Sequence, residues 1–121
     1  MKIKILGIKD GGDLENERIV LVALDDVDIG NYMTGYAKET GETTVATDIL
    51  SPFWFPDTDI RKGDRVIVYT RKGQSGRKVS EDGSSLYFYY RNNDVALCVS
   101  DTIGGIVFEI KDWSFESNRL Q

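Results

Sequence analysis

The sequence predicts an all-β fold, an antiparallel β-sandwich of eight to nine short strands. In several segments apolar residues alternate with polar ones at a two-residue period, as where Ile3 and Ile5 alternate with lysines. Turn signals rich in Gly, Asp and Asn separate these segments at short intervals. No segment of useful length carries the 3.6-residue apolar stripe of an amphipathic helix. These three observations together are typical of a sandwich or barrel.

Length and composition limit the organisation and the chemistry. A chain of 121 residues predicts a single domain over residues 1–121, with residues 116–121 as a frayed tail. Hydrophobic residues make up 40% and charged residues 29%, which is typical of a folded globular chain. A single cysteine excludes an intrachain disulfide, and the absence of histidine excludes His-activated nucleophiles and imidazole metal ligands.

The first half of the chain supplies four expected strands. Residues 2–5 form a half-buried strand, and the short β-branched run 18–24 predicts a strand buried on both faces. Residues 27–36 form an irregular strand after an acidic break. In the segment 52–56 two prolines enclose three aromatic residues, and because proline cannot donate to a ladder, we expect an edge strand there.

The middle of the chain continues the pattern. Residues 65–70 are strongly β-forming, and the glycine-rich residues 72–85 predict the longest loop. In the strand that follows, alternation predicts that one set of side chains faces the core and the other faces outward. The inward set is Leu86, Phe88 and Tyr90, and the outward set is Tyr87, Tyr89 and Arg91.

Two strands are expected near the end of the chain. Residues 95–99 alternate, and the segment 101–105 predicts a hairpin turn because paired glycines can supply positive φ. The last strand is expected to place Ile106, Phe108 and Ile110 inward, and the aromatic residues 113 and 115 to close it.

Charge is distributed unevenly along the chain. The net charge is -5 and the pI is about 4.7, which disfavours a surface devoted entirely to nucleic acid. Residues 61–91 carry +5, so the remainder carries -10. Such a segment predicts either solvated basic loops or a local anion-binding face.

Six short motifs occur in an order that resembles a known family. They are Glu17–Leu21, Val27–Tyr36, Phe53–Pro56, Ile60–Asp64 leading into Val66–Tyr69, Asp94–Leu97, and Thr102–Val107. This order resembles the lamin-tail domain, an immunoglobulin-like sandwich, and is similar to small bacterial proteins with Phe-Trp-Phe-Pro and Lys-Gly-Asp. The resemblance implies a module without catalytic activity that contacts protein, nucleic acid or membrane-associated partners.

Aromatic and basic residues are the candidates for binding. An exposed tryptophan on an edge strand suits a protein partner, whereas a row of tyrosine and arginine beside a basic loop suits nucleic-acid bases. The alternatives are that the aromatic side chains pack in the core or pair across strands. The candidates are Trp54, Arg71, Lys72, Arg77, Lys78, Tyr87, Tyr89 and Arg91.

Acidic residues suggest two further kinds of site. Asp25, Asp26 and Asp28 are weak candidates for a hard cation, and a solvated turn is the alternative. A pair drawn from the carboxylates at positions 57, 59 and 64 would suit a small hydrolase. The glycine-rich residues 73–78 lack the ending and the strand-to-helix context of a phosphate loop.

These observations lead to a ranked functional expectation. We expect a non-catalytic interaction module of the cytoplasm whose partner is a protein or a second copy. A nucleic-acid-binding domain is the first alternative, and a small hydrolase is the second. No cofactor is expected, and no apolar stretch reaches the ~20 residues that a membrane span needs.

Overall fold

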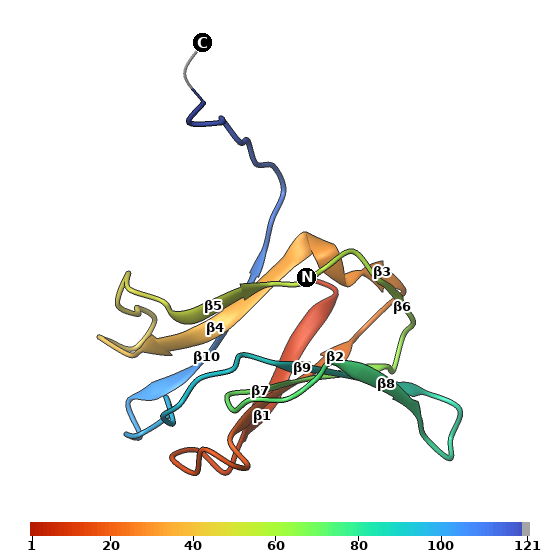
Figure 1. Ribbon diagram of the computed structural model, residues 1–121, viewed down its shortest axis with the longest axis horizontal. Coiled ribbons are helices and arrows are strands. Elements are labelled where there is room, and N and C mark those ends of the chain that lie inside the picture. Colours follow the sequence, from red (N-terminus) through yellow and green to blue (C-terminus); the bar gives the residue numbers. More distant parts are fainter. Residues whose placement is uncertain (120–121) are drawn as a thin grey trace.

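The computed structural model describes residues 1–119, which form an all-β, sandwich-like fold (Figure 1). Its strands make a five-stranded sheet in the order β1-β2-β7-β9-β8, a three-stranded sheet β10-β4-β5, and a short pair β3-β6. The elements are β1 (Ile3–Lys9), β2 (Arg18–Ala23), β3 (Val27–Asp28), the 3-10 helix η1 (Ile29–Asn31), β4 (Tyr32–Lys38), β5 (Leu50–Trp54), β6 (Asp59–Ile60), β7 (Arg65–Tyr69), β8 (Gly76–Val79), β9 (Ser85–Tyr90) and β10 (Ile103–Glu109).

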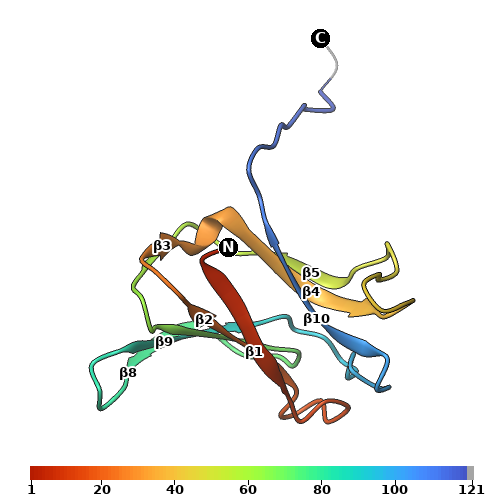
Figure 2. The same ribbon diagram turned by 180° about the vertical axis from the view of Figure 1, so that it is seen from behind.

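The core lies between the five-stranded and three-stranded sheets, which form separate layers in both views (Figures 1 and 2). Alternate residues of β2 and β7 enter it from one layer, because successive strand side chains point to opposite faces. Residues of β4 enter it from the other layer. The largest contributors are Ile3, Ile19, Leu21, Val66, Val68, Tyr32, Tyr36, Phe55 and Ile60, each no more than 3% exposed.

One strand pair is parallel, contrary to the expectation of a wholly antiparallel sheet. β9 pairs with β7 in parallel and with β8 in antiparallel orientation. The expected loop 72–85 therefore contains an edge strand, β8, and a tight turn at Gly83, whose φ is 86°. The chain reverses direction between β7 and β8 and again between β8 and β9. Strand β9 lies between the other two and therefore runs in the same direction as β7.

The expected orientation of the side chains of β9 was wrong. Register pairs Val66 with Tyr87 and Val68 with Tyr89. Both valines are buried in the core, so the two tyrosines beside them also face the core. The other set, expected inward, points to the outer side of the sheet; it comprises Leu86, Phe88 and Tyr90.

The orientation of β10 also differs from the expectation. Val107 pairs with the buried Thr34 and packs on the core, so Ile106 and Phe108 point to the outer side. The paired glycines lie within the strand, not in a turn. A Cβ at Gly105 would lie 2.9 Å from Ile8 Cδ1, so glycine at this register permits the close approach of β1.

Residues 95–99 form no strand, although alternation predicted one. Val95 and Val99 are each 68% exposed. The backbone amides of Leu97 and Cys98 instead donate to the Glu17 carboxylate at 3.0 and 2.7 Å. A buried side chain therefore supplies the hydrogen-bond acceptors that a neighbouring strand would otherwise provide.

Glu17 is fully buried and has four hydrogen-bond donors. The Thr70 hydroxyl and the Gly12 amide join the two amides described above. Burial alone would raise the pKa of the Glu17 carboxyl, but these four donors outweigh burial and lower the pKa below its ordinary value of 4.5. The carboxylate ties the start of β2 to the end of β7 and to the segment before β10.

Residues 111–119 follow β10 without forming a strand, and we call them the C-terminal arm. The arm projects from the molecule on the side of β4 and β5 (Figures 1 and 2). At its base the Trp113 ring packs edge-to-face on Trp54, with centroids 5.1 Å apart. Trp113 and Phe115 therefore do not close a strand, and residues 120–121 of the expected tail lie outside the described part.

Candidate interaction surface

The outer face of the five-stranded sheet carries an apolar row that crosses four adjacent strands. Register places Val20 of β2 beside Ile67 of β7, and Ile67 beside Phe88 of β9. Leu6, at the bulge of β1, adjoins Val20 and is 46% exposed. Val20 is only 7% exposed, whereas Ile67 and Phe88 are half-buried, and none of the three packs on the core. We call these four residues the apolar row.

Cations border the apolar row on both sides. Three of them lie two residues from the row on its own strands, a fourth lies three residues from it on β1, and the fifth lies on β8 opposite Leu86; no outer strand position on this described face carries Asp or Glu. One of the five cations, Arg18, pairs with Asp10 at 2.9 Å, and within residues 1–119 the other four form no ion pair. The five cations are Lys4, Lys9, Arg18, Arg65 and Lys78.

Two tyrosines on this face form a closed stack. The rings of Tyr69 and Tyr90 are nearly parallel, with centroids 5.1 Å apart. The Arg71 guanidinium lies 5.1 Å from each ring centroid, and Arg18 lies 5.8 Å from that of Tyr69. A Cβ at Gly73 would lie only 2.3 Å from Tyr90 Cδ1, so the backbone at Gly73 packs closely against that ring. Neighbouring groups thus already cover these tyrosine rings.

The candidate Arg71 lies at the rim of the outer face, but Trp54 and Lys72 make contacts elsewhere. Trp54 is 43% exposed at the end of β5, where its indole Nε1 donates to the Gly30 carbonyl at 2.7 Å. Lys72 Nζ lies 3.3 Å from Asp94 Oδ1 in a highly exposed pair, which contributes little to stability.

Arg77 and Lys78 of β8 point in opposite directions. Lys78 pairs with Leu86 and belongs to the outer face. Arg77 pairs with Tyr87, and its guanidinium lies 5.6 Å from that ring and donates twice to Ser85 Oγ at 2.8 and 3.1 Å. Arg77 is therefore held on the inner side.

Arg91 and Tyr89 bridge the two layers instead of lining the outer face. The Arg91 guanidinium lies 4.7 Å from the Phe53 ring centroid, and Nη2 donates to the Pro52 carbonyl at 3.1 Å. Tyr89 packs on Phe53 and Phe55 with centroids 5.4 Å away in both cases. Burial lowers the pKa of Arg91 and raises that of Tyr89.

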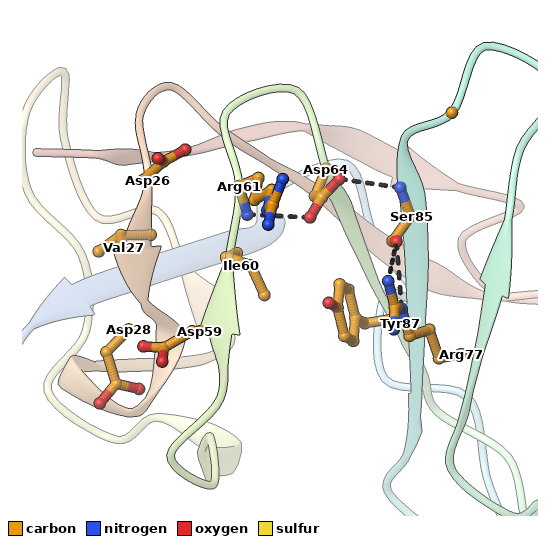
Figure 3. A pocket seen from close by; sticks show the side chains of 11 residues that line it. Asp26, Val27, Asp28, Asp59, Ile60, Arg61, Asp64, Arg77, Ser85 and Tyr87 are labelled. Carbon is orange, nitrogen blue, oxygen red and sulfur yellow. Dashed lines mark hydrogen bonds between the residues drawn. The ribbon is translucent and has the colours of Figure 1, made fainter.

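An open cleft of about 810 Å³ lies between β3–β6 and β8–β9 (Figure 3). Acidic side chains line one wall, and Arg77 lines the other with Tyr87 (Figure 3). Asp64, which is 5% exposed, accepts from the amides of Arg61 and Ser85 at 2.9 and 2.8 Å. It therefore fastens a turn to β9, and Gly63 with φ 90° allows that turn.

The other acidic candidates are also engaged with the backbone. Asp28 Oδ1 accepts from two amides, those of Gly30 and Thr58, at 2.8 and 3.0 Å. Asp26 accepts from the Lys62 amide at 2.9 Å, and Asp25 from the Asp26 amide at 2.8 Å. Such contacts are typical of turn-forming aspartates. Within residues 1–119, no three metal-ligating side chains gather into a group.

Of the three carboxylates considered for a hydrolase, only Asp64 is buried. Asp57 and Asp59 are exposed, and Asp59 lies opposite Asp28 in the register of β3 and β6. Asp64 is committed to its two amides.

Several residues that make the outer face distinctive were not predicted from the sequence. Leu6, Arg65 and Ile67 were not candidates. The sequence did contain a sign of an apolar outer face, because residues 66–69 are apolar or aromatic at every position. Successive side chains of a strand point to opposite faces, so every second one of these residues had to point outward while the others filled the core. Every position in residues 86–90 is also apolar or aromatic, and there the side chains expected to face the core point outward instead.

Comparisons with protein-family models, with curated proteins and with solved structures find no match. The only helix in the described residues is η1, which has three residues, so no helix there is long enough to cross a membrane.

Proposed function

We propose that this chain is a non-catalytic interaction module that binds an acidic, apolar segment of a protein partner. The outer face of the five-stranded sheet is the binding surface. The observation that carries the proposal is the apolar row between two cationic borders, on a chain whose net charge is -5. Apolar contact would supply affinity and the lysines and arginines would select acidic partners.

The closed tyrosine stack favours protein over nucleic acid. Base recognition on a sheet face uses aromatic rings whose faces are free to stack. Here Tyr69 and Tyr90 cover each other, Arg71 lies over both, and Gly73 presses on Tyr90. An apolar side chain packing on Ile67 and Phe88 needs no such free ring.

We extend the proposal to the fold family and the compartment. The order of sequence motifs and the layered β-sheets support an immunoglobulin-like sandwich of the lamin-tail kind, in which loops and one sheet face contact partners. The single cysteine, Cys98, supports a reducing, cytoplasmic setting.

Selection from a random peptide display library on the immobilised full chain tests this function. We expect enriched peptides to contain aromatic or aliphatic residues flanked by Asp or Glu. Binding should fall by about tenfold or more in the variant Arg65→Glu/Lys78→Glu. The matched control Lys38→Glu/Lys62→Glu changes the net charge equally but away from the outer face, and it should keep the affinity.

Three outcomes would contradict the proposal. One is the absence of enriched peptides, and another is equal loss of binding in the face variant and its control. The third is binding of single-stranded oligothymidine by the outer face in place of peptides, with an affinity that falls steeply with salt.

A further inference from the structure

Within residues 1–119 the aromatic side chains of the C-terminal arm touch the body only where Trp113 packs on Trp54, and Ile67 and Phe88 of the outer face pack on no second layer. We propose that the arm of one copy docks on the outer face of a second copy, with Trp113 and Phe115 along the apolar row. This inference rests on the proposed function, because it names one occupant of that surface.

The arm exposes two large aromatic residues. Trp113 is 64% exposed despite its contact with Trp54, and Phe115 is 80% exposed. In an extended chain, residues two positions apart point to the same side, so both rings can face one surface. Aromatic side chains of this size commonly dominate the energetics of an interface.

The middle of the arm and the outer face carry opposite charges. Residues 112–116, which hold both aromatic side chains, carry Asp112 and Glu116 and no cation, whereas Lys111 and Arg119 near the two ends make the arm neutral as a whole. The outer strand positions carry five cations and no acid, and four of these cations have no ion pair within residues 1–119. Opposite charges on matching surfaces favour this orientation over contact between two outer faces, which would repel each other.

The lengths of the two surfaces also agree. The apolar row crosses from β1 to β9, a distance of three strand spacings or ~14 Å. Extended chain from residue 112 to residue 116 spans four residue rises, or ~13 Å. An arm laid across the strands therefore covers the row from one end to the other.

The position of the arm makes the contact intermolecular. It leaves the molecule beside the three-stranded sheet, whereas the outer face lies on the far side of the other layer (Figures 1 and 2). The contact joins different surfaces of two copies, so it is heterologous. Repetition of such a contact gives an open chain of copies or a ring.

A complementation experiment tests the inference with full-length chains. The arm variant Trp113→Ser/Phe115→Ser keeps the outer face, and the face variant Arg65→Glu/Lys78→Glu keeps the arm. Light scattering after size exclusion should show assembly of the wild type as concentration rises, and monomers for each variant alone. An equimolar mixture of the two variants should form dimers and no larger species, because only one productive contact remains.

The control Lys38→Glu/Lys62→Glu should assemble as the wild type does, and circular dichroism should show native β-structure in every variant. A wild type that stays monomeric at all concentrations, an arm variant that still assembles, or a mixture that stays monomeric would overturn the inference. Display peptides that bind the outer face of a monomeric wild type would leave the proposed function standing. If the wild type neither assembles nor binds display peptides at the outer face, both the inference and the proposed function are wrong.

Discussion

At the scale of single residues, we expect the Glu17 side chain to contribute strongly to the stability of the fold, because it connects three separate segments by hydrogen bonds. It has four hydrogen-bond donors and no exposed surface. Replacing the carboxylate by an amide turns one acceptor into a donor that faces other donors. We expect Glu17→Gln to lower the free energy of unfolding by about 2–3 kcal/mol, because buried amides lose their acceptor. Urea denaturation measures this change.

The neighbouring Glu15 offers a matched control for that substitution. It is exposed, and its carbonyl rather than its carboxylate accepts from Arg71. Glu15→Gln should change stability by less than about 0.5 kcal/mol. Equal effects of the two substitutions would show that the Glu17 carboxylate does not anchor the fold.

The lowered pKa of Glu17 also predicts a pH dependence. A carboxyl whose pKa is lower in the folded chain contributes stability that is complete above its ordinary pKa of 4.5. This contribution is lost as pH falls through the lowered value. The stability difference between wild type and Glu17→Gln should therefore narrow below about pH 4.5, as measured by urea denaturation at a series of pH values. A constant difference down to low pH would contradict the assignment.

At the scale of elements, residues 95–99 are predicted to behave as a protected segment without being a strand. The amides of Leu97 and Cys98 should exchange slowly with solvent, because Glu17 accepts from both. In Glu17→Gln these amides should exchange much faster, while amides of Ile67 and Val68 in β7 exchange faster only to the extent of the global destabilisation. Native-state hydrogen exchange followed by NMR separates the two groups, and equal acceleration throughout would argue against a local anchor.

The strands show what alternation can predict and where it fails. The strands at Ile3, Leu21 and Val66 were predictable because turn signals bound short β-forming runs. The orientation of residues 86–90 was not, since Leu86 and Tyr87 are both large and either could fill the core. The partner strand decides, because Val66 faces inward and its register partner Tyr87 must follow.

The predicted side-chain orientation of the last strand, β10, was wrong for a different reason. Its isoleucine and phenylalanine predicted the inward face, but Gly105 is needed beneath Ile8, and this fixes the opposite parity. A glycine that makes room for a distant strand leaves no periodic signal in the sequence. Likewise, the sequence around Val95 does not indicate that the Glu17 carboxylate accepts hydrogen bonds from this segment, as a neighbouring strand would.

At the scale of the whole molecule, the basic segment 61–91 does not form a single face. Arg65 and Lys78 point to the outer face, Arg77 and Arg91 are held on the inner side, and Arg61 lines the cleft. The outer face becomes cationic because Lys4, Lys9 and Arg18 join from the acidic remainder of the chain. Sheet topology, not sequence proximity, therefore assembles this surface.

We propose the outer face of the five-stranded sheet as the surface at which this molecule contacts its partner. Amide NMR spectra of the full chain, recorded as an acidic aromatic peptide selected by display is added, test it most directly. We expect shifts centred on Leu6, Val20, Ile67 and Phe88. Shifts centred instead on the cleft around Asp28 and Asp59, with the outer face unchanged, would contradict it.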